Sequence, residues 1–486
     1  MQGTLRQWFF HEDSWAITLG LGMVVACSGL FAWDPTGLLG QVHLSVPHWG
    51  SLGALEGIVQ EQGTSFLGGF LVVLLITLAS ARGMGISLYE WARGFSFLFV
   101  LILICMVVGS YIPVKALKLE GPLLALLLGF AVGNVFQVPQ WMRVAMRGEF
   151  WLKLGIILMG ATLPFSVILS AGPVAIGQSL LISCLGFGST YFIGKRIFGL
   201  DSKLSAALAG GLAVGNVTGV IACSEASKAK LPVIKTGFVL VVLSSIVLMF
   251  LLTGLSEVLA LPASLAGAWI GSSETADVAG FAALSAMNSE VALQSYTLVK
   301  VIGRDMSVAG WAFLVAMVAV HAGSKEAKAQ LAHESALIGK DGQGTLVQCA
   351  LGQPEQVETE DELVQNKPSS QSLLNKVKIY GQQIWQRFPK FILGLFGASM
   401  LTAFIIYLLP ASAVGSYQAE ALGLLKDLRG WFFTLCFLSI GMSTRVHDIR
   451  SIGWRPVGAF SLSIGITTIV GYILSVYVFQ DFWNAL

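Results

Sequence analysis

The chain has 486 residues, of which 55% are hydrophobic and only 12% are charged, and its formal net charge is +2. A soluble protein carries roughly 25% charged residues, so this composition excludes a soluble globular protein and predicts a polytopic membrane protein. The near-neutral charge argues against a nucleic-acid partner. The lipid bilayer is the expected partner of most of the surface.

Thirteen apolar segments predict membrane-crossing helices, because such a helix needs about 20 apolar residues. They lie near residues 15–33, 66–80, 95–113, 121–137, 152–171, 174–194, 204–224, 236–255, 260–284, 293–321, 391–409, 428–443 and 456–478. We therefore expect an all-α, multi-pass protein of the cell inner (plasma) membrane.

Lys and Arg in short loops indicate the orientation, because they favour the cytoplasmic side. The stretch from Asp34 to Phe66 has neither residue and is expected outside. This places the N-terminus inside and the C-terminus outside. Simple counting puts Lys228, Lys230 and Lys235 outside, against the rule. Either the segment before them is broken or one segment is miscounted.

Two stretches of similar sequence form an internal repeat. Residues 154–182 and 435–463 align at a shift of 281 (441 − 160), and both read as span, short turn, span. The matched glycines are Gly160, Gly172 and Gly177 with Gly441, Gly453 and Gly458. An odd number of predicted helices separates the copies, so their orientations are expected to be inverted, as in many secondary transporters.

The first of two polar stretches inside apolar segments is rich in glycine. It runs from Gly210 to Gly219 and contains Asn216 and Thr218. Glycines allow close helix approach or local unwinding, which would present Asn216 and Thr218 to a ligand. The alternative is a helix-packing face in which Asn216 bonds to a neighbouring helix.

The second polar stretch runs from Trp269 to Asp277 and contains Ser272 and Ser273. An Asp at a helix centre costs about 2.5–3.5 kcal/mol on the translocon scale, which points to a function. Glu274 and Asp277 are three residues apart and share one face if the segment is helical. The pair is suited to exchange a proton or to bind Na⁺ with oxygens that include Thr275. The alternative is a solvated or structurally paired couple.

Two cations lie four residues apart in a later apolar segment, at Lys300 and Arg304, and Asp305 follows. This spacing puts both cations on one helix face. They are candidates to bind an anion, to neutralise Glu274 and Asp277, or to do both.

The order of these motifs resembles the YeiH-like family, whose members carry a provisional label of sulfate exporter. The resemblance covers about residues 120–321 and 390–480. The family's glycine-rich segment resembles 210–216, and its G-S-x-H-[DE]-x-A-Q-V motif resembles 271–278. Its K-x-x-R motif is similar to 300–304, with one more residue between the cations, and its L-G-[LM]-[ST]-T motif is similar to 440–444.

The chain departs from the family pattern at three positions. Thr218 stands at the usual Cys, Ser273 at the usual His and Asp277 at the usual Gln. The resemblance implies an inverted-repeat fold similar to bile acid/sodium symporters and cation/proton antiporters, with two broken helices crossing near the midplane.

On this basis we divide the chain into four regions. Residues 1–118 form an N-terminal extension with about three transmembrane helices, and 119–321 form the first part of a transporter core. Residues 322–390 form a charged cytoplasmic loop, and 391–486 form the C-terminal part of the core.

We expect an ion-coupled secondary transporter, an exporter of a small anion such as sulfate, another sulfur oxyanion or a sulfonate. The expected substrate-binding residues are Asn216, Thr218, Ser272, Ser273, Lys300 and Arg304. The expected residues for the coupling ion, Na⁺ or H⁺, are Glu274, Asp277 and Thr275. The alternative is a cation/proton antiporter that uses Glu274 and Asp277.

Other roles lack sequence support. The chain has no H-E-x-x-H or G-x-S-x-G motif, so we expect no enzyme. We also expect no metal and no cofactor beyond the coupling ion. A homodimer is left open.

Overall fold

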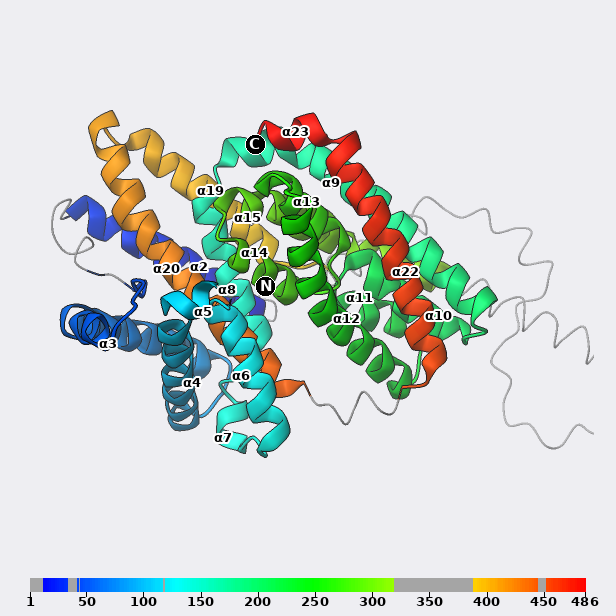
Figure 1. The fold of residues 1–486 in the computed structure, drawn as a ribbon, viewed down its shortest axis with the longest axis horizontal. Helices are drawn as coiled ribbons and strands as arrows, with labels where there is room; N and C mark the ends of the chain where they lie inside the picture. The colour runs from blue at the N-terminus through cyan, green and yellow to red at the C-terminus, as the bar shows by residue number, and fades with distance from the viewer. Residues whose placement is uncertain (1–11, 34–41, 43, 117–118, 319–387, 445–451) are drawn as a thin grey trace, which may run out of the picture.

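The computed structural model describes residues 12–33, 42, 44–116, 119–318, 388–444 and 452–486, whose arrangement is shown in Figure 1. Within these ranges nearly all elements are helices, and eight helices are long and apolar enough to cross a membrane. The prediction of an all-α polytopic membrane protein is confirmed. Most of the expected charged loop, and Arg445 and Arg450, lie outside the described residues.

One group of helices, the scaffold bundle, combines the N-terminal helices with two helices from after residue 388. Its members are α2 (Glu12–Trp33), α3 (Leu52–Gly83), α4 (Leu88–Gly109), α5 (Ile112–Ala116), α6 (Gly121–Val135), α7 (Gln140–Arg143), α8 (Gly148–Thr162), α19 (Phe391–Leu408) and α20 (Ala411–Ser443). α20 packs along α6 and α8. A Cβ atom on Gly129 or Gly441 would overlap the backbone of the facing helix, so these glycines permit the close approach of α6 and α20.

The other group, the core bundle, contains the two polar stretches. Its members are α9 (Phe165–Phe192), α10 (Ser202–Val214), α11 (Val217–Ala226), α12 (Leu231–Val258), α13 (Ala263–Ser273), α14 (Asp277–Met287), α15 (Glu290–Tyr296), α22 (Trp454–Ile473) and α23 (Gln480–Asn484). Figure 1 shows the scaffold bundle at the left and the core bundle at the right. Helix α14 of the core packs on α6 and α20 of the scaffold.

The first polar stretch folds into a helical hairpin of α10 and α11. Gly215 follows α10 with a left-handed φ of +70°, and α11 runs back along α10. The arms touch at Gly210 and Gly219, where a side chain on either would overlap the backbone opposite. The chain reverses here because glycine adopts positive φ without strain and because the small residues let the arms pack.

The open end of this hairpin explains the anomaly in the loop charges. Lys203 Nζ, at the start of α10, donates a hydrogen bond to the carbonyl oxygen of Lys228, just after α11 (3.2 Å). The two ends therefore lie on the same side of the membrane. Lys228, Lys230 and Lys235 then lie on the same side as Lys203, the side that the loop charges predict to be cytoplasmic.

The second polar stretch forms another hairpin, from α13 and α14. α13 packs along α15 in the same direction through its glycines. α14 runs the opposite way, because Phe281 packs on Tyr296 (ring centroids 4.9 Å apart) and the earlier residue Asp277 bonds the later residue Lys300. Helix α12 joins the open ends of the two hairpins. Its 28 residues span about 42 Å, so the hairpins open toward opposite sides.

The predicted broken helices are thus present, and each folds back on itself instead of passing through. We call residues 215–216 the first tip and residues 274–276 the second tip. The hairpins point toward each other from opposite sides, so their tips meet inside the core bundle. The two hairpins therefore have opposite orientations in the membrane, as expected of the inverted repeats of secondary transporters.

The internal repeat is visible in helix boundaries as well as in sequence. Helices α8 and α20 end at Thr162 and Ser443, which differ by the repeat shift (443 − 162 = 281). Helices α9 and α22 continue into one π-helical turn each, η2 (Ile193–Ile197) and η5 (Leu474–Val478), again 281 apart (474 − 193). Both copies therefore lead from the scaffold into the core with the same local geometry.

One boundary in the first copy differs from the prediction. The expected spans 152–171 and 174–194 place the turn near residue 172, but the turn is at Leu163 and Pro164. Proline disfavours a helical conformation in the residue before it, and Leu163 is extended. Pro173, by contrast, is accommodated inside α9.

The hairpin of α10 and α11 makes a testable prediction about topology. With Cys184 and Cys349 replaced by serine, Lys230→Cys should react with a membrane-impermeant maleimide in inverted vesicles and not in right-side-out vesicles. Ser412→Cys, at the exposed start of α20, should show the reverse pattern. Labelling of Lys230→Cys from outside only would mean that α10 and α11 cross the membrane as one span.

Candidate functional site

Arg304 joins the tips of the two hairpins. It is the last residue of a π-helix, η3 (Thr297–Arg304), and its side chain is fully buried. In the first hairpin, its guanidinium donates to the carbonyl oxygens of Leu212 (2.5 Å) and Ala213 (3.3 Å). In the second hairpin, it donates to the carbonyl oxygens of Gly271 (3.1 Å), Ser272 (2.9 Å) and Glu274 (2.9 Å). The last carbonyls of a helix have no partner within the helix and carry the negative end of its dipole. One cation therefore satisfies the ends of α10 and α13 together.

Gly215 makes room for this contact. A Cβ atom there would lie 2.6 Å from the Arg304 guanidinium and 2.7 Å from the Glu274 carbonyl oxygen. With its positive φ as well, the position suits glycine for two independent reasons. The glycine-rich motif thus serves the meeting of the tips.

An ion network lies beside Arg304. The Lys300 ammonium bonds one carboxylate oxygen of Asp277 and one of Asp305 (2.6 Å), and all three side chains are buried. The Asn216 amide donates to the other carboxylate oxygen of Asp277. Asp277 thereby connects the first residue of α14 to the first tip, and Lys300 neutralises it.

Glu274 is separated from this network. Its side chain is fully buried at the end of α13, and Oε1 accepts a hydrogen bond from the Thr275 amide (2.9 Å). Among the described residues, Oε2 has no hydrogen-bond partner. The extended second tip separates Glu274 from Asp277, so the two carboxylates do not share a helix face.

The remaining residues of the second stretch lie inside the core bundle. Ser272 donates to the Ala268 carbonyl oxygen (2.9 Å) and accepts from Gln178 Nε2 (2.8 Å). Thr275 Oγ1 lies 3.1 Å from Ser244 Oγ on α12. Ser273 is fully buried as well. These side chains support the second tip from behind.

A cavity of about 480 Å³ lies between the bundles at the hairpin tips. We call it the inner cavity, because its lining reaches the cytoplasmic ends of α2, α8 and α20. The first residues of α11 and α14 line it, including Asn216, Thr218 and Asp277. Neither helix has a side-chain N-cap. Amide groups at two positive helix ends therefore face one space.

The structure thus divides the predicted site residues into two sets. Asn216, Thr218 and Asp277 line the inner cavity, whereas the others form the packed layer behind the tips: Ser272, Ser273, Glu274, Thr275, Lys300 and Arg304. Their roles toward a substrate or a coupling ion remain predictions.

Sequence reasoning missed the opposite wall of the cavity. Lys153 on α8 lines it and pairs with Asp13 on α2 (2.6 Å). A lysine just after the start of an apolar segment carries no sequence signal that distinguishes it from a loop charge. Its pairing with a residue 140 positions away could not be found from the sequence.

These features define a multi-pass helical membrane protein with two opposed hairpins that meet beside a cavity. The family described as conserved hypothetical protein 698 matches residues 93–338, half of the chain, and the chain belongs to that family. The predicted resemblance to YeiH-like proteins is confirmed.

Relatives extend the match over most of the chain. A UPF0324 membrane protein of Rhodopirellula baltica is 26% identical over 431 residues, which cover 87% of this chain and 70% of that protein. A UPF0324 membrane protein of Nitrosomonas europaea is 25% identical over 494 residues, covering 91% and 90%. The UPF0324 inner membrane protein YeiH of Escherichia coli K12 is 30% identical over 151 residues, covering 29% and 42%. No solved structure gives a significant match.

Removing Arg304 should destabilise the junction of the tips. We expect Arg304→Gln to lower the free energy of unfolding by about 3–5 kcal/mol, because buried carbonyl groups at both helix ends lose their charged donor. Arg304→Lys should recover only part of the loss, because one ammonium cannot reach both helix ends. Thermal melting of the purified protein in detergent measures the effect.

The exposed Arg196 supplies the control for this experiment. Arg196→Gln should change the melting temperature little, because surface substitutions usually alter stability by at most about 0.5 kcal/mol. Equal melting of the Arg304→Gln and Arg196→Gln proteins would show that Arg304 does not join the tips.

Proposed function

We propose that the protein is a secondary transporter that exports a small anion such as sulfate or an organic sulfonate. The observation that carries this proposal is that the helix N-termini of both hairpin tips face the inner cavity. Helix N-termini attract anions through free amides and the helix dipole. Half-helix ends near the midplane, at the interface of inverted repeats, are typical substrate sites of secondary transporters.

The carboxylate at the start of α14 already has polar partners at both of its oxygens. Asp277 lies at the start of α14, but Lys300 and Asn216 hold both of its oxygens. Thr218 is exposed to the cavity and contributes a hydroxyl group at the first turn of α11. A bound anion would therefore meet amide and hydroxyl donors at the tips.

The cavity also suits a substrate with an apolar part. Phe238 and Ile246 on α12 and Leu152 on α8 contribute apolar surface to its walls. An organic sulfonate could place its charged group at the tips and its carbon chain against these walls. The inner cavity reaches the cytoplasmic helix ends, where an exported substrate enters.

Export requires the two bundles to move against each other. The core bundle carries both tips, and the scaffold bundle supplies the facing wall through α8 and α20. Rocking of the core would carry the bound anion from one side to the other, as in transporters built from inverted repeats.

Transport by this site is tested with purified protein in proteoliposomes. Wild-type protein should catalyse saturable counterflow of radiolabelled sulfate or methanesulfonate. Thr218→Val should raise KM roughly tenfold or more, because a hydrogen bond to a charged group contributes about 1.5–3 kcal/mol. Thr253→Val, the same change on α12 outside the cavity lining, should behave as wild type.

Two results would count against this assignment. An absence of saturable counterflow for both anions would remove the proposed function. Counterflow that is unaffected by Thr218→Val would show that the substrate does not bind at the first tip.

For the coupling ion, we propose a proton carried by Glu274. Its Oε2 atom has no partner among the described residues, and burying a bare carboxylate oxygen is costly. Binding a proton removes that cost. Na⁺ coupling at the tips is less favoured, because the Arg304 guanidinium already occupies the carbonyl groups of both helix ends.

Glu274→Gln should therefore keep anion counterflow but lose the acceleration produced by an imposed pH gradient. The amide preserves the shape of the side chain and cannot exchange a proton at neutral pH. Sodium-driven proton movement without any dependence on anions would instead support the cation/proton antiporter.

A further inference from the structure

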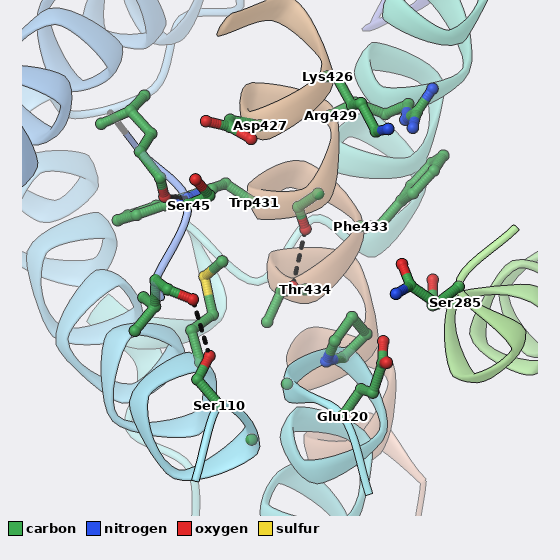
Figure 2. A pocket seen from close by; sticks show the side chains of 18 of the residues that line it. Ser45, Ser110, Glu120, Ser285, Lys426, Asp427, Arg429, Trp431, Phe433 and Thr434 are labelled. Atoms are coloured by element: carbon green, nitrogen blue, oxygen red, sulfur yellow. Dashed lines mark hydrogen bonds between the residues drawn. The ribbon is translucent and has the colours of Figure 1, made fainter. Parts of the chain in front are cut away.

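A second cavity, of about 330 Å³, lies between the same two bundles on the other side of the tips. We call it the outer cavity, because its lining reaches the extracytoplasmic ends of α4, α6 and α15. Figure 2 shows its interior, with Lys426 and Arg429 on one side of α20 and Ser45 and Trp431 on the other. Neither the sequence motifs nor the proposed inner site involves these residues.

One turn of α14 separates the two cavities. Ala279 lines the inner cavity and Leu284 lines the outer one, five residues apart and therefore about 7.5 Å along the helix. Between them, the fully buried Phe281 stacks on Phe433 of α20, with ring centroids 4.6 Å apart. This aromatic contact joins core to scaffold between the two cavities.

An ion pair joins the same two bundles at the outer cavity. Arg429 of α20 donates to Glu290 Oε1 (2.8 Å) and Oε2 (3.2 Å) at the start of α15. Its other nitrogen donates to Thr162 Oγ1 of α8 (2.9 Å), which anchors Arg429 in the scaffold. By contrast, Lys153 with Asp13 and Lys300 with Asp277 each pair within one bundle.

Burial makes Arg429 the dominant partner of Glu290. The Arg429 side chain is only 5% exposed, whereas Lys426, which also bonds Glu290 Oε1 (2.9 Å), is 52% exposed. A screened surface pair contributes little, but a buried guanidinium left without an anion is strongly unfavourable. Withdrawal of Glu290, whose side chain is 36% exposed, would leave the Arg429 guanidinium without this carboxylate, and another anion could take its place.

We propose that the outer cavity is the outer half of the anion pathway and that Arg429 is its anion-binding residue. In the closed state the Glu290 carboxylate occupies the position of the substrate on Arg429. When the outer side opens, the transported anion replaces that carboxylate. This inference rests on the proposed anion transport, to which it adds a second binding position and the contact that controls access to it.

The test measures access to each cavity with a cationic methanethiosulfonate reagent on full-length protein in nanodiscs. Ser285→Cys reports on the outer cavity and Thr218→Cys on the inner one, both with Cys184 and Cys349 replaced by serine. We expect Glu290→Gln to raise the labelling rate of Ser285→Cys about tenfold and to lower that of Thr218→Cys, because the closed state loses the carboxylate that pairs with the buried Arg429. Lys426→Gln should change either rate less than about twofold.

The same proteins test anion binding by Arg429. In the Glu290→Gln protein, sulfate or methanesulfonate should slow the labelling of Ser285→Cys, at an ionic strength kept constant with gluconate. The protection should disappear when Arg429→Gln is added. Protection that persists without Arg429, or that never occurs, would overturn the assignment of Arg429.

Labelling also tests the contact between Glu290 and Arg429, which we call the gate, separately from the transport proposal, because labelling requires no net transport. Unchanged rates in Glu290→Gln would overturn the gate even if proteoliposomes carry anions. A parallel rise at both reporters would also overturn it, because this would show a loosened fold. If the rates shift in opposite directions while no anion is carried, the gate stands and the transport proposal fails.

Discussion

The arrangement of the core depends on one buried guanidinium. Two hairpins entering from opposite sides bring the carbonyl ends of α10 and α13 together, and like partial charges would repel there without a counterion. Arg304 supplies that counterion as part of the chain. Because it is covalently bound and always charged, it stays at the junction of both helix ends. The helix N-termini, which face the other way, remain available for an anion.

The functional account follows from how the tips are placed between the bundles. The inner and outer cavities lie on the two sides of one aromatic contact on α14, and both are bounded by α20. Buried charge is arranged differently in each bundle. Inside the core, Lys300 pairs with Asp277 and Asp305, whereas the pair of Glu290 and Arg429 extends across the interface. A pair inside a bundle fixes its structure, and a pair across the interface controls whether the bundles separate.

Much of this organisation could be predicted from the sequence, because it depends on local patterns. Hydropathy predicted the helices, the shift of 281 predicted the repeat, in which α8 and α20 end at Thr162 and Ser443, and polar residues beside glycines marked both tips. The reversal of each broken helix could not be predicted. It depends on the packing of Gly210 against Gly219 and on the reach of Arg304, which are tertiary contacts. The outer cavity was missed for the same reason, since Glu290 and Arg429 are 139 positions apart.

The central claim is that an anion binds where the N-termini of α11 and α14 meet the inner cavity. Crystals of the protein soaked in selenate, which mimics sulfate and scatters anomalously, test this claim most directly. The account predicts a selenium peak at a position that puts selenate oxygens within hydrogen-bonding distance of the amides that follow Asn216 and Ala276. A peak confined to Lys153 on the opposite wall, or no peak in the cavity at selenate concentrations that inhibit counterflow, would contradict it.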